Sequence, residues 1–163
     1  MNIATRNLLA EMMLEALDDQ IAAQTVHCLA AYCHAINKTP PALAVDRFLQ
    51  AVQEEEQEAV LAKLLNNPLL SWDLRGRSGR VTLSPGFSSA WPAIAARLVR
   101  FEAVLKDWSA TAGEAALTQA LRKGIALFNH RLCFEVHEVL EAQWSRETGD
   151  AKQFLQGIIQ IAV

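Results

Sequence analysis

The sequence predicts an all-α protein, a bundle of about six helices with one short β-hairpin near residues 69–84. Apolar residues recur at three- and four-residue spacing along most of the chain, which is typical of amphipathic helices. Proline and glycine interrupt this spacing at only a few points. With 163 residues, 52 % of them hydrophobic and 20 % charged, the chain has the length and composition of a folded globule.

The first two helices are predicted from an apolar stripe and a proline pair. The stripe of the first, over residues 5–37, is formed by Leu14, Leu17, Ile21, Cys28, Leu29, Tyr32 and Ile36. Pro40 and Pro41 end this helix, because proline lacks the amide hydrogen that a helix needs. A second helix is expected over 42–65, with the acidic run at 54–58 as a solvated face. The short link between them predicts an antiparallel pair.

A break and a helix start are predicted in the middle of the chain. Pro68 follows two asparagines and ends the second helix, and β-branched residues and glycines then indicate the hairpin. Ser88 or Ser89 is expected to cap a helix that runs to about Trp108. Pro92 falls in its first turn, where a missing amide hydrogen does little harm.

The C-terminal third is predicted to contain three helices. Thr111 and Glu114 have the spacing of a capping box at the start of a helix over 112–130. A helix over 132–146 follows and ends at Gly149, the residue type that most easily adopts the left-handed conformation. The last helix begins directly after this glycine.

Two regions follow from these elements. Residues 1–110 are expected to be an N-terminal helical region of unknown function, and residues 111–163 a C-terminal helical domain. The last segment stops at Val163 in the middle of an apolar pattern, without a glycine, proline or polar turn. We therefore expect the C-terminal domain to be truncated here.

Composition excludes several classes of protein. No basic segment precedes an apolar stretch at the start, and no apolar run reaches about 18 residues, so neither a secretory leader nor a membrane span is predicted. Three cysteines without paired spacing (Cys28, Cys33 and Cys133) fit reduced thiols in a cytoplasm. A net charge of −3 argues against nucleic-acid binding, while homo-oligomerisation stays open.

Candidate chemistry is concentrated in residues 128–144. On a helix that advances about 100° per residue, polar and aromatic side chains share one broad arc: Phe134, His137, Glu138, Glu141 and Trp144. His137 and Glu141 are four residues apart, so their side chains meet on one face and can share a metal ion or a proton. These two groups leave a metal short of three or four protein ligands, so further ligands must come from elsewhere.

Two interpretations of this cluster are open. In the first, it binds a small ligand or a divalent metal and acts in hydrolysis or acid–base chemistry, with His137 and Glu141 as ligands or proton carriers and Glu138 as their electrostatic neighbour. The ligand pocket would then be lined by Phe134, Trp144, Asn129, Gln156 and Gln160. In the second, the cluster is a buried network that fixes the helices of a non-catalytic interaction module. Whether the protein is an enzyme is not decided.

A longer pattern runs through the same stretch: Phe128, Asn129, Phe134, Glu135, His137, Glu138, Glu141 and Trp144, then Gln156, Gly157, Ile158, Ile159 and Gln160. It resembles the prokaryotic family known as domain of unknown function 309, over about residues 120–163. The resemblance implies a helical fold and brings no established activity. The family often has glycine where Arg131 stands and an aromatic residue where Cys133 stands, so the turn into this helix is expected to differ. Similar sequences continue with a helix that often contains another histidine, which would place a third metal ligand beyond Val163.

Two other groups of residues have less specific patterns. One lies on the first predicted helix: His27, Cys28, Cys33 and His34. A single ion cannot easily reach all four from one helix, so core packing is preferred over a zinc site. The other lies on the predicted hairpin: Arg75, Arg77 and Arg80. These resemble the basic wing of a DNA-binding domain, but a solvated turn explains them as well.

Overall fold

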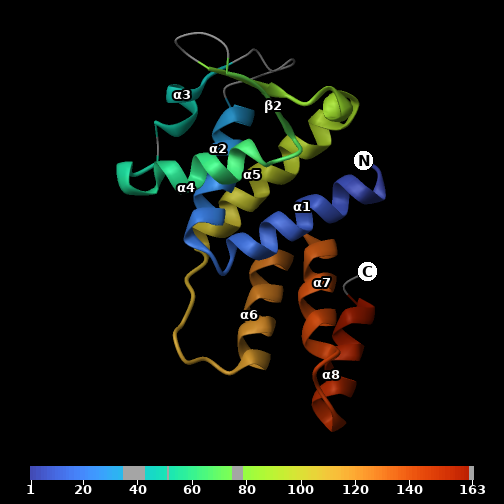
Figure 1. Ribbon diagram of the computed structural model, residues 1–163. Coiled ribbons are helices and arrows are strands. Elements are labelled where there is room, and N and C mark those ends of the chain that lie inside the picture. The colour runs from blue at the N-terminus through green and yellow to red at the C-terminus, as the bar shows by residue number, and fades with distance from the viewer. Residues whose placement is uncertain (35–42, 51, 75–78, 162–163) are drawn as a thin grey trace.

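The computed structural model describes residues 1–34, 43–50, 52–74 and 79–161, and it confirms a predominantly helical bundle (Figure 1). Its helices are α1 (Ile3–Ala16), α2 (Gln20–His34), α3 (Val45–Leu49), α4 (Glu54–Leu65), α5 (Trp91–Asp107), α6 (Ala116–Asn129), α7 (Cys133–Trp144) and α8 (Gly149–Ile161). The strands are β1 (Leu43–Ala44), β2 (Leu70–Asp73) and β3 (Arg80–Leu83). A 3-10 turn, η1 (Pro85–Ala90), leads into α5. No described helix is long and apolar enough to cross a membrane.

The first predicted helix is in fact two helices, so the prediction of one helix over 5–37 was wrong. The chain turns between Ala16 and Gln20, and α1 and α2 pack against each other (Figure 1). Asp19 explains the break, because its Oδ1 accepts a hydrogen bond of 2.6 Å from the amide of Ala22 and so caps the start of α2. Residues 35–37 of that prediction lie outside the described residues.

The second predicted helix, 42–65, is also divided. Its first described residues form β1, which pairs antiparallel with β3 and completes a three-stranded sheet of order β1-β3-β2. The short helix α3 follows, and α4 begins only at Glu54. Of the expected helical pair, the contact between α2 and α4 is present. The hairpin prediction is confirmed, since β2 and β3 pair antiparallel with Leu70 opposite Leu83.

Helix α5 lies at the centre of the hydrophobic core. Ile94, Leu98, Phe101 and Val104 recur at helical spacing along it and are fully buried. The expected serine caps are absent, because the N-cap residue is Ala90 and makes no side-chain cap bond. η1 precedes the helix instead.

The predicted capping box before α6 was also wrong. The helix begins at Ala116, and Arg122 binds both residues of the expected box through its Nη1, at 2.8 Å from Thr111 Oγ1 and 2.8 Å from Glu114 Oε2. Thr111 and Glu114 therefore accept hydrogen bonds from Arg122 of α6 instead of from amides at the start of the helix. Gly149, with φ of +59°, is the first residue of α8 rather than the terminator of α7.

Contacts join the last three helices to the rest of the chain. Lys123 of α6 pairs with Asp18, with nitrogen–oxygen distances of 2.6 Å. Helix α1 also packs on α7 (Figure 1). The division at residue 110 stays a prediction, and these contacts cross it.

Candidate functional site

Helix α7, which carries the candidate residues, begins after a tight turn. The amide of Arg131 donates to the carbonyl of Phe128 at 2.9 Å, and the amide of Leu132 donates to the carbonyl of Leu127 at 3.0 Å. Arg131 has φ of +58°, in the left-handed region that favours glycine. The turn therefore has the conformation that a glycine would adopt, although arginine occupies the position.

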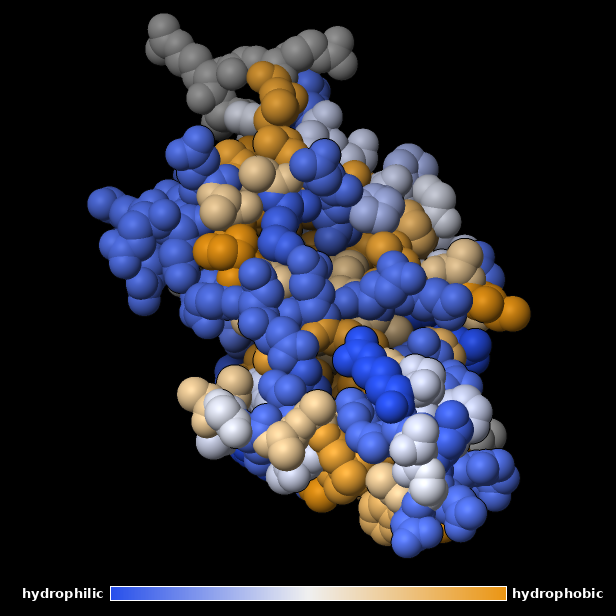
Figure 2. Space-filling view, turned by 60° about the horizontal axis from the view of Figure 1, so that its bottom comes forward, coloured by the Kyte–Doolittle hydropathy of each residue, from blue (hydrophilic) through white to orange (hydrophobic). Residues whose placement is uncertain are grey.

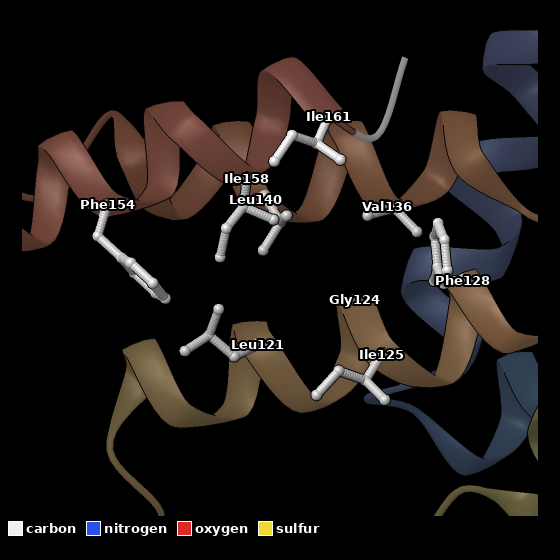
Figure 3. A pocket seen from close by; sticks show the side chains of 9 residues that line it. All are labelled: Leu121, Gly124, Ile125, Phe128, Val136, Leu140, Phe154, Ile158 and Ile161. Atoms are coloured by element: carbon white, nitrogen blue, oxygen red, sulfur yellow. The ribbon is translucent and has the colours of Figure 1, made fainter.

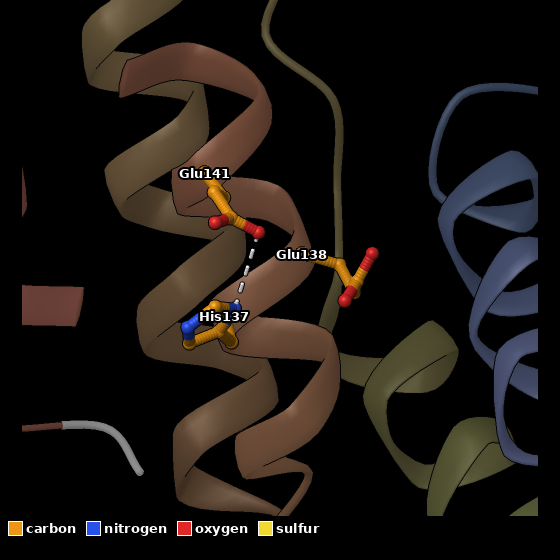
Figure 4. Close-up of side chains that lie close together, drawn as sticks. All are labelled: His137, Glu138 and Glu141. Atoms are coloured by element: carbon orange, nitrogen blue, oxygen red, sulfur yellow. Dashed lines mark ion pairs between the residues drawn. The ribbon is translucent and has the colours of Figure 1, made fainter. Parts of the chain in front are cut away.

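His137 and Glu141 lie together on one face of α7. His137 Nδ1 is 3.5 Å from Glu141 Oε2, as the spacing of four residues predicts (Figure 4). Their side chains are 30 % and 54 % exposed, so this face is open to solvent. The expectation of a buried network at these two residues is not supported, because neither is enclosed.

Glu138 adds a third potential ligand atom. Single nitrogen or oxygen atoms of His137, Glu138 and Glu141 all lie within 4.8 Å of one another. Atoms that bind one ion at about 2.1 Å can be no more than about 4.2 Å apart, so a small rotation of the Glu138 side chain would complete the set. In Figure 4 the Glu138 carboxylate points in a different direction from the other two side chains, so it is the group that would have to rotate.

The predicted aromatic and amide lining of this site is dispersed. Phe134 packs under the guanidinium of Arg6 from α1, at 3.9 Å from the ring centroid. Asn129 is exposed at the end of α6, and Gln156 and Gln160 are exposed on α8. The binding roles of these residues stay predictions.

Trp144 is half-buried at the end of α7. Lys152 Nζ of α8 lies 4.3 Å from its ring centroid. The buried indole Nε1–H has no hydrogen-bond acceptor among the described residues. Trp144 therefore connects α7 to α8 through its ring, while its polar atom is left for a water molecule or a ligand.

A buried ion pair lies on the opposite side of α7 and was missed as a site in the sequence. Glu135 is fully buried and binds Arg97 of α5 through both carboxylate oxygens, at 2.7 Å to Nε and 2.6 Å to Nη2. Burial raises the pKa of the Glu135 carboxyl above its ordinary value, and the Arg97 guanidinium opposes this rise. The buried carboxylate of α7 that pairs with another helix is therefore Glu135, and not Glu141.

A second feature missed in the sequence is an apolar pocket between α6, α7 and α8. It has a volume of about 420 Å³ and is lined by Leu121, Gly124, Ile125, Phe128, Val136, Leu140, Phe154, Ile158 and Ile161 (Figure 3). Apolar residues recur on α6 and α8 in the sequence, but no pocket was predicted from them. In Figure 2 hydrophobic side chains reach the surface on the lower part of the molecule.

The C-terminal helices are similar to a known protein family. Residues 121–163 match the family model for the Domain of unknown function (DUF309). The matched DUF309 segment takes in most of α6 and all of α7 and α8, and it confirms the resemblance seen in the sequence. No curated protein and no solved structure matches the chain. The C-terminal quarter of the chain is therefore similar to DUF309, and this similarity brings no activity with it.

The structure describes only part of the two less specific groups. Cys28 and Cys33 are buried in the core, and burial raises the pKa of their thiols to about 11 and about 12. Thiols that stay protonated are poor metal ligands, which supports core packing. The side chain of His34 and the residues Arg75 and Arg77 lie outside what the structure describes.

Proposed function

We propose that the DUF309 segment binds a divalent transition-metal ion through His137, Glu138 and Glu141. The observation that supports this most directly is the grouping of one imidazole and two carboxylates within 4.8 Å on an accessible helix face. Imidazole suits zinc, copper, iron and nickel, and carboxylate suits harder ions such as manganese, so a mixed set favours zinc or manganese over calcium or magnesium.

The arrangement leaves part of the coordination sphere open. Three ligands from one helix occupy one side of an ion, and the exposed side chain of Glu141 indicates that the other side faces solvent. A metal with three protein ligands and an open position can bind and activate water, as in hydrolytic zinc sites. We propose hydrolysis as the reaction class that such a site would serve.

Metal binding is tested by calorimetric titration of the purified chain with Zn²⁺ and, separately, Mn²⁺. We expect one ion per chain, and at least a tenfold loss of affinity for His137→Ala with the fold intact by circular dichroism. His130→Ala is the matched control, because His130 is also half-buried beside α7 but pairs with Asp107 at 3.1 Å. Absence of stoichiometric binding in the wild type, or equal loss in both variants, would contradict the proposal.

A further inference from the structure

The apolar pocket between α6, α7 and α8 is a feature that metal binding does not use. Helices α6 and α8 both pack on α7, and the side chains of Leu121 and Phe154 face each other across the space that remains (Figure 3). Leu140 and Val136 of α7 form the floor. The pocket is therefore a trough with α7 as its floor and α6 and α8 as its two walls.

The lining decides what chemistry the pocket accepts. All nine lining residues are apolar, and none offers a side-chain hydrogen bond or charge. A polar group placed in this pocket would lose its hydrogen bonds to water and find no hydrogen-bond partner in the protein. This costs roughly 1–3 kcal/mol, as judged from the effects of mutations in proteins. The inserted part of an occupant must therefore be hydrocarbon.

Four of the residues that line the pocket are exposed, and no described residue covers them. Ile161, Ile125, Phe128 and Phe154 are 83 %, 61 %, 56 % and 55 % exposed, and together they are four of the nine large hydrophobic side chains that are exposed in the described chain. All four line this one pocket. Clustered apolar exposure of this kind marks a binding surface, whereas single exposed residues are ordinary.

The volume of the pocket is that of a small-molecule site. A volume of about 420 Å³ lies within the range of roughly 300–1,000 Å³ for small-ligand pockets. This volume is about three times that of a cavity of ~150 Å³, which holds one benzene molecule.

Length gives the approximate size of the ligand. Leu121 and Phe128 on α6 are seven residues apart, as are Phe154 and Ile161 on α8, so the trough runs for about 10 Å at 1.5 Å per residue. An extended hydrocarbon chain with C–C bonds of about 1.5 Å covers this length with roughly eight to ten carbons. The open side of the trough leaves the polar end of such a molecule in water.

We propose that this pocket binds the hydrocarbon part of a small amphiphile, a medium-length acyl or alkyl chain. Gly124 contributes to the shape, because a Cβ at this position would lie 3.4 Å from Leu140 Cδ2 and would narrow the floor. The site is independent of the His137 cluster, since the two groups share no residue.

The test is a calorimetric titration of the full chain with decan-1-ol and with sodium decanoate, below their aggregation limits. We expect one molecule per chain, with the alcohol and the carboxylate within a few-fold of each other because the head group stays in water. Ile158→Trp, which places a larger side chain in the trough, should weaken both at least tenfold. Val99→Trp, on an exposed hydrophobic residue of α5, is the matched control and should leave binding unchanged.

Three results would overturn the proposal. They are no saturable binding to the wild-type chain, equal affinity for the Ile158→Trp variant, and equal loss in the Val99→Trp control. A dimer by sedimentation that Phe128→Asp dissociates, with no alkyl binding, would assign the trough to a second copy of the chain instead. Circular dichroism of each variant establishes that it is folded, and Leu121→Trp is the substitute if Ile158→Trp does not fold.

Discussion

The left-handed conformation of Arg131 gives the sharpest stability prediction. A non-glycine residue in this region costs roughly 1–2 kcal/mol, because its Cβ approaches the following carbonyl oxygen. Glycine removes this cost, but it restores about 0.5–1 kcal/mol of conformational freedom to the unfolded chain. Arg131 is exposed, and its backbone carbonyl, which lies 3.5 Å from Arg100 Nη1, is retained in a glycine variant. Arg131→Gly should therefore stabilise the fold by a net ~0.5–1 kcal/mol.

The measurement is a thermal melt followed by circular dichroism. For a chain of this length, 1 kcal/mol corresponds to about 2–4 °C in Tm, so we expect a rise of roughly 1–4 °C. Ala142→Gly is the matched control, because Ala142 is exposed on α7 at an ordinary helical position and the substitution should lower stability by ~0.5–1 kcal/mol. A fall in Tm for Arg131→Gly, or the same sign for both variants, would refute the reasoning.

Three other predictions concern the cysteines and the buried ion pair. Under native conditions a thiol reagent should modify exposed Cys133 rapidly, and Cys28 and Cys33 only after unfolding. Burial raises the pKa of the Cys28 thiol from 9.0 to about 11 and that of the Cys33 thiol from 9.0 to about 12. Above pH 9 the folded state therefore binds more protons than the unfolded state. The free energy of unfolding, measured by denaturant melts, should fall as the pH rises from about 9 to about 12. Arg97→Met should destabilise the fold by about 3–5 kcal/mol, because it leaves the buried Glu135 carboxylate without its partner, whereas Arg97→Met combined with Glu135→Leu should cost much less. Equal melting temperatures for the single and double variants would contradict this account of the pair.

The helical fold could be predicted from the sequence because its signals are local. Apolar spacing and prolines gave the helices and the hairpin, since both depend on neighbours within a few residues. The predicted helix boundaries were wrong where a side chain could hydrogen-bond to more than one partner. Asp19 caps a new helix inside a continuous apolar stripe, and Arg122 withdraws Thr111 and Glu114 from their expected cap. Sequence spacing identifies potential partners but does not rank them.

The same distinction applies to the candidate site. His137 and Glu141 meet because residues four apart on a helix are neighbours, which the sequence states directly. The partner of Glu135 is Arg97, 38 residues away on α5, and nothing local to either residue indicates the pair. The pocket was missed for a related reason, because apolar spacing shows which side chains face inward but not whether the helices close over them.

The contact between Arg6 and Phe134 bears on the order in which the chain folds during synthesis. The two residues are 128 positions apart, yet the guanidinium lies 3.9 Å from the ring centroid. Helix α1 can pack on α2 as soon as both have left the ribosome. The contact between α1 and α7 cannot form until α7 has been translated. During that interval the side of α1 that packs on α7 lacks this part of its final covering. The nascent protein thus carries a partly covered first helix until α7 has been synthesised, the stage at which a chaperone would bind it.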